Sequence, residues 1–396
     1  MVSGAVIAIV CLPALLTLVW FFEVLTGCLA LRKRGTSPVV TPVASSHRTT
    51  VLVPAHNEGG GILPTIDDIQ AQLGPNDSIL VVADNCTDDT AAIVLAAGVE
   101  VAVRTDPVRR GKGYALEFGV RQLRLNPPDV VVIMDADCRL GENALRCMSE
   151  SAMASGRPVQ SLYLMLAPEN APPGKGVNLF AWRVRNWIRP LGLGLFGLPT
   201  QLFGTGMAFP FRLLADRDLG NSRLAEDCAL GIALASAGHP PLFVSEARVH
   251  SHFPVSQAGS ESQRQRWEKG HLENIIDLVP GALARSLRDR NVGLAALAID
   301  MAVPPLSLLV LITALSAVLG GVACVLGASS AALAIPLLSA LLVGLGTVLA
   351  WRAVGRDVLP LRELLRLPLH ALRKLGFYHG IASGKASSSW IRTDRK

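Results

Sequence analysis

Residues 130–137 read Val-Val-Val-Ile-Met-Asp-Ala-Asp, five apolar residues followed directly by two carboxylates around one alanine. Four of the five apolar residues are β-branched, which predicts a short strand that is buried on both faces. Three similar runs precede it, at residues 50–53, 79–82 and 99–102, with helical stretches between them. This alternation predicts an α/β domain with a parallel sheet, in which ligands bind beyond the carboxyl ends of the strands.

Polar residues follow these runs at the predicted carboxyl ends. His56-Asn57-Glu58 follows the first run, Asp84 opens a polar stretch after the second, and Arg109-Arg110-Gly111-Lys112-Gly113 lies beyond the third. The glycines beside Lys112 would let the backbone approach a phosphate closely. Two alternatives stay open, namely that Asp84 caps a helix beginning near Asp88 and that Lys112 is an ordinary solvated lysine. The first run is not followed by a GxGxxG loop, which disfavours a dinucleotide and favours a nucleotide attached to a sugar.

Asp135 and Asp137 leave the fourth run together and can present two carboxylates near one point. Mg²⁺ and Mn²⁺ prefer such oxygen ligands, shared with the phosphates of a substrate. A metal held there would act as a Lewis acid and neutralise a departing nucleoside diphosphate. Paired Asp residues after a strand are also common as turn formers and helix caps.

Two later motifs add candidate catalytic and binding groups. Glu226-Asp227 precedes an apolar helical stretch, where a carboxylate suits either the charge of a helix N-terminus or a general base beside an acceptor hydroxyl. Gln263-Arg264-Gln265-Arg266-Trp267 lies in a polar stretch that is predicted to be helical. Arg266 can bind a diphosphate through two hydrogen bonds, and Trp267 can stack on a sugar. Taken alone, this stretch would be a solvated face with one buried Trp.

The order of these motifs closely resembles that of membrane-bound family 2 glycosyltransferases, which include cellulose, chitin and hyaluronan synthases and bacterial exopolysaccharide enzymes. The resemblance covers about residues 48–275 and also rests on Pro54-Ala55-His56-Asn57-Glu58. Each motif is weak alone, and their order makes the resemblance specific. It implies a GT-A fold, a Rossmann-like and mostly parallel sheet that binds a nucleotide sugar, with a divalent cation and inversion at the anomeric carbon.

The resemblance also implies a role for each motif residue. Asp227 would be the base and Asp137 the metal ligand, and the nucleotide sugar would be held by Glu58, Asp84, Lys112 and Asp135. The diphosphate and the acceptor end would be held by Glu226, Gln263, Arg266, Trp267 and the loop residues Gly204, Thr205 and Gly206. A plain Gly-rich turn is the alternative for that loop. Trp390-Ile391-Arg392-Thr393 also resembles a family feature.

Several features leave the product and part of the site open. Ala225 stands where cellulose synthases usually have Thr, and the chain has about three spans where polymer-exporting relatives have more. His250 and His252 follow an expected strand at 241–244 and are candidates to complete the metal site, with surface or core positions as the alternative. A further group would form either a cradle for an anionic lipid-linked acceptor or an interfacial helix: Trp182, Arg183, Arg185, Trp187 and Arg189.

Three apolar segments are long enough to span a bilayer, at about residues 5–31, within 294–326 and within 331–351. Arg32-Lys33-Arg34 follows the first, and no Lys or Arg precedes it, so the positive-inside bias predicts an outside N-terminus and a cytoplasmic domain. Leu25-Thr26-Gly27-Cys28 resembles a lipoprotein cleavage box. That alternative is disfavoured because signal peptides carry their positive charge before the apolar core.

Composition and charge narrow the class further. The chain has 396 residues, of which 50% are hydrophobic and 17% charged, and a net charge of +6, too apolar for an ordinary soluble protein. Residues 352–396 hold ten Lys or Arg against three acids, which predicts contact with anionic lipid headgroups. No nucleic-acid-binding motif is present, so nucleic acid is not an expected partner. The seven cysteines lack a CxxC or metal spacing and are predicted to be reduced.

Leucines recur at helical spacing in the basic tail, at positions 361, 364, 365, 372 and 375. They predict a helix lying in the membrane interface, with packing on the globular domain as the alternative. The predicted organisation is therefore a transmembrane anchor at 1–34, a cytoplasmic GT-A domain at 46–283, two transmembrane helices at 294–352, and a basic interfacial helix with a cytoplasmic tail at 353–396.

The predicted function is an inverting transfer of a sugar, with Mg²⁺ or Mn²⁺, from a UDP-sugar to a growing polysaccharide or a polyprenyl-linked glycan at the inner face of the plasma membrane. The alternatives are a single addition to a lipid acceptor and a catalytically silent subunit of a polysaccharide synthesis complex. A homo-oligomer or separate export partners would reconcile few spans with export. The sugar, the linkage and the acceptor are not encoded by these motifs.

Overall fold

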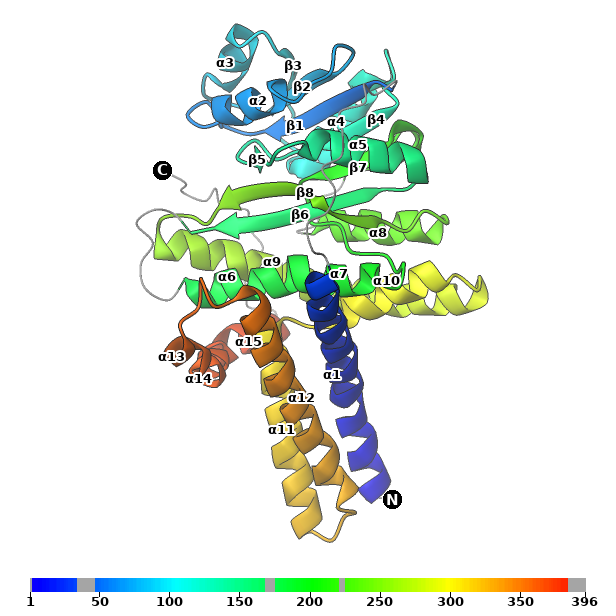
Figure 1. The fold of residues 1–396 in the computed structure, drawn as a ribbon, viewed down its shortest axis with the longest axis vertical. Helices are drawn as coiled ribbons and strands as arrows, with labels where there is room; N and C mark the ends of the chain where they lie inside the picture. The colour runs from blue at the N-terminus through cyan, green and yellow to red at the C-terminus, as the bar shows by residue number, and fades with distance from the viewer. Residues whose placement is uncertain (1, 34–46, 168–174, 221–224, 384–396) are drawn as a thin grey trace.

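The computed structural model describes residues 2–33, 47–167, 175–220 and 225–383, so the motif at 390–393 lies outside it. Within these ranges eight strands form one sheet in the order β3-β2-β1-β4-β7-β6-β8-β5 (Figure 1). The strands are β1 (Thr49–Ala55), β2 (Ser78–Asp84), β3 (Glu100–Arg104), β4 (Val130–Ile133), β5 (Arg139–Leu140), β6 (Val159–Leu166), β7 (Met207–Pro210) and β8 (Leu242–His252).

The first half of the sheet is parallel, as the four apolar runs predict. β1 pairs in parallel with both β2 and β4, and β2 pairs in parallel with β3. The sheet as a whole is mostly parallel, but β7 runs antiparallel to β4 and β6, and β5 runs antiparallel to β8. Since β6 and β8 are again parallel to each other, β7 joins two parallel sets.

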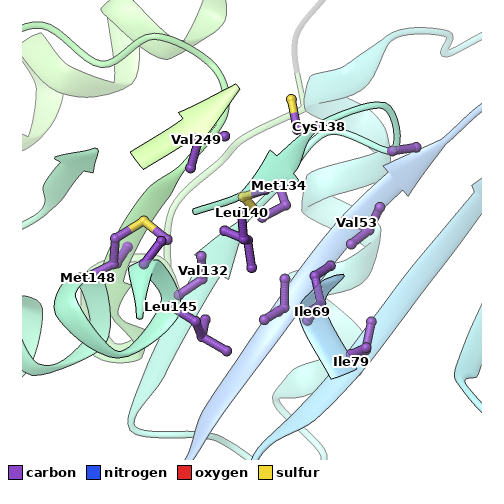
Figure 2. Packing of buried hydrophobic residues seen from close by; sticks show 14 of the residues in the cluster. Val53, Ile69, Ile79, Val132, Met134, Cys138, Leu140, Leu145, Met148 and Val249 are labelled. Carbon is purple, nitrogen blue, oxygen red and sulfur yellow. The ribbon is translucent and has the colours of Figure 1, made fainter. Parts of the chain in front are cut away.

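Both faces of the parallel half are covered by helices. Alternate residues of one strand point to opposite faces, so Val51 and Val53 join one core while Leu52 joins the other. Helices α2 (Leu63–Gln70), α3 (Thr90–Ala96) and α5 (Ala144–Ser155) cover the first face, and α4 (Lys112–Leu123) covers the second. Figure 2 shows the first core, with side chains from β1, β2 and β4 meeting those of α2 and α5.

Strand β8 is longer than the sequence predicts. The expected strand at 241–244 continues to His252, because a bulge absorbs the expected turn: between Ser161 and Leu162 of β6, the partner residue shifts from Val244 to Arg248. His250 and His252 therefore lie within the strand and not after it.

The second half of the domain carries helices between the sheet and the long apolar helices. They are α6 (Gly176–Arg183), the π-helix η1 (Val184–Ile188), α7 (Arg189–Gly194), the 3₁₀-helix η2 (Phe211–Leu213), α8 (Glu226–Ser236) and α9 (Gln257–Arg288). Helix α10 (Val292–Ala302) packs on α8 and α9. Figure 1 shows α6, α7, α9 and α10 as a layer beneath β6 and β8.

Three helices are long and apolar enough to cross a membrane in the described part of the chain. They are α1 (Val2–Lys33), α11 (Leu306–Val325) and α12 (Ala331–Val354), and they project together from one end of the domain (Figure 1). The second span is thus shorter than the apolar run at 294–326, since Pro304 and Pro305 separate α10 from α11.

The basic segment after α12 is three short helices and not one interfacial helix: α13 (Leu361–Leu364), α14 (Leu367–Arg373) and α15 (Leu375–Ala382). Pro360 precedes α13 and Pro368 opens α14, and proline cannot continue a helix through these points. Leu364 is buried while Leu365 and Leu372 are exposed, so the segment packs on the protein and still presents apolar side chains outward.

One buried ion network joins the apolar anchor to the domain. The Arg189 guanidinium on α7 donates to the Glu23 carboxylate of α1 and to the Asp300 carboxylate of α10, each at 2.6 Å. Helices α1 and α7 lie close enough for this contact because Gly27 and Gly192 have no side chains. A side-chain carbon at Gly27 would clash with the Ile188 carbonyl, and one at Gly192 would clash with the Glu23 carbonyl.

Replacing Arg189 should therefore destabilise the protein far more than replacing an arginine whose carboxylate partner is exposed. Arg189→Ala leaves two buried carboxylates without their cation, which costs about 3–5 kcal/mol. Arg183→Ala is the matched control, because its partner Asp357 is 65% exposed and such pairs contribute about 0–1 kcal/mol. Thermal unfolding of both variants in detergent measures the difference, and equal midpoints would contradict a stabilising role of the buried network.

Candidate active site

The loops that follow the first strands are held together by two asparagines. Asn57 and Asn85 both adopt left-handed backbone conformations, with φ of 55° and 51°, which Asn tolerates better than most residues. The Asn57 side-chain oxygen accepts a hydrogen bond from the Thr87 N–H at 2.7 Å, and that of Asn85 accepts one from the Asp106 N–H at 2.8 Å. The loops after β1, β2 and β3 therefore meet at one edge of the sheet.

Asp84 ends β2 within this group of loops and is buried. Its carboxylate accepts hydrogen bonds from the Arg104 guanidinium at 2.6 Å and from the Asn85 amide at 3.0 Å. Helix α3 begins only at Thr90, so Asp84 does not cap it. Glu58 lies on the adjoining loop, where its N–H donates to the Thr90 hydroxyl at 2.9 Å.

Lys112 is the cation that links three of the predicted motifs. It begins α4, contacts the Asp135 carboxylate, and donates to the Gly204 carbonyl at 2.7 Å. Burial by itself would lower the pKa of Lys112, but the negative charges of Asp135 and Glu226 outweigh it and raise the pKa above its usual value. The ammonium group therefore stays charged and is an internal contact, not a solvated one.

The glycine-rich loop at 203–206 lies beside this lysine. Gly204 and Gly206 have φ of 84° and 61°, conformations that other residues rarely adopt. The Thr205 hydroxyl accepts a hydrogen bond from the Asp135 N–H at 3.0 Å. A side-chain carbon placed on Gly204 would lie 3.4 Å from an Asp227 carboxylate oxygen and 3.6 Å from Lys112 Nζ. The loop is thus part of the same site as the carboxylates.

Asp135 and Asp137 form the candidate metal centre together with Cys138, since one ligand atom from each lies within 4.8 Å of the others. Burial raises the pKa of the Cys138 thiol to about 12, so the sulfur stays protonated and is a poor ligand. The remaining donors are carboxylate oxygens, which fit Mg²⁺ or Mn²⁺. Ser251 supports Asp137 by donating to its carboxylate at 3.0 Å.

Neither candidate histidine belongs to this cluster in the described residues. Neighbouring residues of a strand point to opposite faces, and Ser251, which lies between the two histidines in β8, is the residue that contacts Asp137. His250 instead pairs in register with Arg139 of β5.

Glu226 and Asp227 form the first turn of α8 and complete the acidic part of the site. Burial raises the pKa of Glu226, and the Asp227 charge raises it further. Burial also raises the pKa of Asp227, against the opposing effects of the Cys228 N–H, which donates to its carboxylate at 2.9 Å, and of the Lys112 and Arg185 charges. A carboxylate with a raised pKa suits a general base that works near neutral pH.

Helix α9 brings the predicted Gln263, Arg266 and Trp267 to the same region. Burial lowers the pKa of Arg266, against the opposing effects of the Glu226 and Asp135 charges. Gln263 is buried, and its side-chain oxygen has no hydrogen-bond partner among the described residues. The Trp267 ring packs on Trp182, with ring centroids 4.7 Å apart.

The run at 182–189 does not form one surface, and the expected lipid cradle or interfacial helix is wrong for Arg189, which is buried. Trp182 joins the aromatic group around Trp267, Arg183 pairs with Asp357, and Arg189 is buried in the ion network. Arg185 stands 5.8 Å over the Phe203 ring and lowers the pKa of Asp227, so it is a candidate member of the same site as Asp227. It lies in the π-helix η1, where an ordinary helical period cannot predict the direction of a side chain.

Gln160 contacts the candidate site although no sequence motif predicts it. Its buried amide donates to the Thr205 carbonyl at 3.0 Å and accepts from the Phe203 N–H at 2.8 Å, which fixes the glycine-rich loop. A single glutamine inside an apolar strand does not form a recognisable sequence motif. Its contact with the glycine-rich loop becomes visible only when β6 packs against that loop.

Comparisons with known proteins agree with this geometry. Residues 47–270 match the family model described as "Glycosyltransferase like family 2". No curated protein matches the chain in sequence.

Among solved structures, the fold is similar to that of a mannosyltransferase from Pyrobaculum calidifontis solved in complex with GDP-Man and Mn²⁺. The TM-score is 0.53 at 18% sequence identity, and the match covers 93% of this chain and 98% of the other. A glucosyl-3-phosphoglycerate synthase from Mycobacterium tuberculosis, solved with Mn²⁺, UDP and phosphoglyceric acid, also matches, with a TM-score of 0.37 and 24% identity over 57% of this chain and 78% of the other. The first match supports a GT-A fold.

Metal binding can be tested directly at the carboxylate pair. Asp137→Asn should weaken Mn²⁺ binding by at least about tenfold, since even outer-shell partners of a metal contribute factors of this size. Asp89→Asn is the control, because Asp89 is exposed and lies outside the cluster. Electron paramagnetic resonance titration with and without a nucleoside diphosphate gives both affinities. Equal affinities in the two variants would place the metal elsewhere.

Proposed function

This chain belongs to glycosyltransferase-like family 2, and from this premise we propose that it is an inverting, metal-dependent transferase that moves a sugar from a UDP-sugar to a growing polysaccharide or polyprenyl-linked glycan. The observation that carries the proposal is the convergence of Lys112, Asp135, Gly204 and Asp227 at one edge of the sheet. These residues come from four separate parts of the chain. A lysine with a purely structural role would not need to lie beside Asp135, Gly204 and Asp227 together.

The proposed reaction uses Asp227 as the base. The acceptor hydroxyl oxygen attacks the anomeric carbon and Asp227 takes its proton. The bond between that carbon and the diphosphate oxygen breaks, and the nucleoside diphosphate leaves with the electron pair, so the anomeric configuration inverts. Cys228 fixes the base by donating its N–H to one Asp227 oxygen. The Gly204 loop lies against the other oxygen, and the absence of a side chain there leaves space beside the base.

The donor side of the proposed site is built around the strand ends. Asp84, held by Arg104, and Glu58 would contact the nucleotide, while Lys112 and Arg266 would face the diphosphate. Asp137 would hold Mg²⁺ or Mn²⁺, with Asp135 near the diphosphate and donor sugar, and the ion would supply a positive charge for the leaving group. Ser251 keeps the Asp137 carboxylate oriented.

The acceptor side would lie toward α9 and the apolar helices. The unpartnered oxygen of buried Gln263 supports contact with a polar ligand there, as an unsatisfied buried acceptor is costly. Glu226 and the Trp267 ring would complete this side of the site. Because Trp267 also packs on Trp182, its orientation is set before any sugar binds.

For location, we infer a multi-pass protein of the plasma membrane with α1, α11 and α12 as spans and the catalytic domain in the cytoplasm. The proposed parts are an anchor at 1–34, the domain at 46–283, the spans within 294–352, and a basic region at 353–396 beside anionic headgroups. The positive charges of Arg32 and Lys33 in the last turn of α1 support this orientation. A homo-oligomer or an export partner would be needed if a long polymer leaves the cell.

Two alternatives share this site. A single addition to a lipid acceptor would use the same residues and yield one discrete product, whereas a silent subunit would show no turnover. The nucleotide of the sugar donor, UDP or GDP, is also to be tested, since the Pyrobaculum calidifontis neighbour was solved with GDP-Man.

Asp227→Asn should remove most of the activity. Loss of a positioned base typically lowers the rate by about 10²–10⁴. The assay supplies the lipid-reconstituted protein with Mn²⁺, a panel of labelled UDP-sugars and GDP-mannose, and natural lipid extract, and separates the products by size. Asp216→Asn is the control, since its carboxylate is 99% exposed. A long ladder indicates processive synthesis and one lipid-soluble product indicates single addition, while no turnover of the wild type would favour the silent subunit.

The pH dependence of kcat/KM should report the protonation of the proposed base, Asp227. The base works only when deprotonated, so kcat/KM should fall as pH drops through a pKa that lies above the ordinary Asp value. Arg185→Gln removes a positive charge that lowers the pKa of Asp227, so it should move this acid limb to higher pH. Arg288→Gln, whose side chain is 73% exposed, should leave it in place. An unmoved or lowered limb in Arg185→Gln would contradict the assignment of Asp227.

A further inference from the structure

A cavity lies outside the carboxylate site, between the domain-side ends of the apolar helices α1 and α12. Its volume is about 600 Å³. Leu25, Leu29 and Arg32 are spaced at i, i+4 and i+7, so they share one face of α1. Leu349, Arg352 and Ala353 are three and four residues apart at the end of α12, Arg356 follows just beyond it, and both sets line the cavity. Two helix faces of the same character therefore meet across it.

The cavity exists because the other faces of α1 are occupied. Gly27 lies against the Ile188 carbonyl of η1, and Trp20 lies against Gly346 of α12 about two turns before the cavity. These contacts hold the helices in place without covering the face that carries Leu25 and Leu29.

The charges in the cavity are of one sign. Among the described residues, the charged side chains that line it are Arg32, Arg352 and Arg356. None of them makes an ion pair within the described ranges of the chain. Each helix C-terminus contributes the equivalent of about half a negative charge, so two helix ends offset only about one of the three positive charges. A net positive charge remains.

The walls suit a ligand with an apolar part. The leucines, Cys28 and Ala353 give an apolar surface, and it begins inside helices that are apolar enough to cross a membrane. The arginines lie at the end nearer the domain, where the last turns of both helices carry basic residues. Arg356 is partly oriented by the Trp351 ring, 5.5 Å from its guanidinium carbon. The cavity is thus positive at one end and apolar toward the membrane.

We propose that this cavity binds a membrane lipid with an anionic phosphate headgroup, with the phosphate on the three arginines and the chains along Leu25, Leu29 and Leu349. Guanidinium groups pair well with phosphate oxygens through parallel hydrogen bonds. A free phosphate ion would use the arginines but not the apolar walls, and an uncharged lipid would use only the walls. The inference is independent of the proposed transfer reaction, because it concerns other residues.

The test measures lipid binding without any sugar donor. Delipidated full-length protein in detergent is titrated with dioleoyl phosphatidic acid, dioleoylglycerol or inorganic phosphate, and bound adducts are counted by native mass spectrometry. We expect phosphatidic acid to bind at least tenfold more tightly than either of the others. The triple variant Arg32→Gln, Arg352→Gln, Arg356→Gln should lose about 100-fold in affinity, since each basic residue near anionic lipid contributes a factor of about five.

The matched control removes the same charge at the same end of the helices. Lys33, Arg362 and Arg366 are exposed and do not line the cavity, so Lys33→Gln, Arg362→Gln, Arg366→Gln should retain most of the affinity. Equal losses in the two triple variants would show general attraction to charge and overturn the site. Tight binding of inorganic phosphate, or of dioleoylglycerol, would overturn the lipid phosphate assignment. The three single variants, each a small surface change, keep the test valid if the triple variant does not fold.

Discussion

The buried guanidinium of Arg189 is the constraint on which the arrangement of domain and apolar helices depends. Glu23 lies in the middle of an apolar helix, where an unpaired carboxylate would be strongly unfavourable. Arg189 and Asp300 form a network with it, and the Gln201 amide donates to the second Asp300 oxygen at 2.8 Å. A shift of α1 along α7 and α10 would separate these groups and leave buried charges unpaired, so the network favours the register that is observed.

This constraint reaches the active site through few side chains. Gln201 accepts a weak hydrogen bond from the Cys228 thiol at 3.6 Å, and the Cys228 N–H holds the Asp227 carboxylate. The acidic end of α8 is therefore placed relative to the anchor helix by direct contacts. Within the site, three cations, those of Lys112, Arg185 and Arg266, interact with the carboxylates of Asp135, Glu226 and Asp227. Asp137 lies beside Asp135 and brings the number of carboxylates to four. A diphosphate would add negative charge to this excess, which is the electrostatic reason for expecting a divalent cation.

Sequence reasoning predicted the fold class because its signals are local. Four apolar runs with β-branched residues became β1 to β4, and the three apolar helices follow from length and hydropathy alone. The motif residues were found because their order is specific, although their roles stay predictions. Local signals failed where a contact came from far along the chain: the bulge that carries β8 to His252, the antiparallel insertion of β7, and the π-helix that turns Arg185 toward Asp227.

The sequence by itself determined the parallel strands and the apolar helices, the membership of the family, and which carboxylates and cations were available for chemistry. Only the tertiary structure decided which of them meet. Glu23 and Asp300 are isolated polar residues in apolar runs when read along the chain, and they become partners of Arg189 only because glycines let the helices approach. Likewise, the two arginine-bearing helix ends are more than three hundred residues apart in sequence and form one cavity in space. Periodicity shows which face of a helix is apolar, but the partner of that face is chosen by the packing of the whole chain.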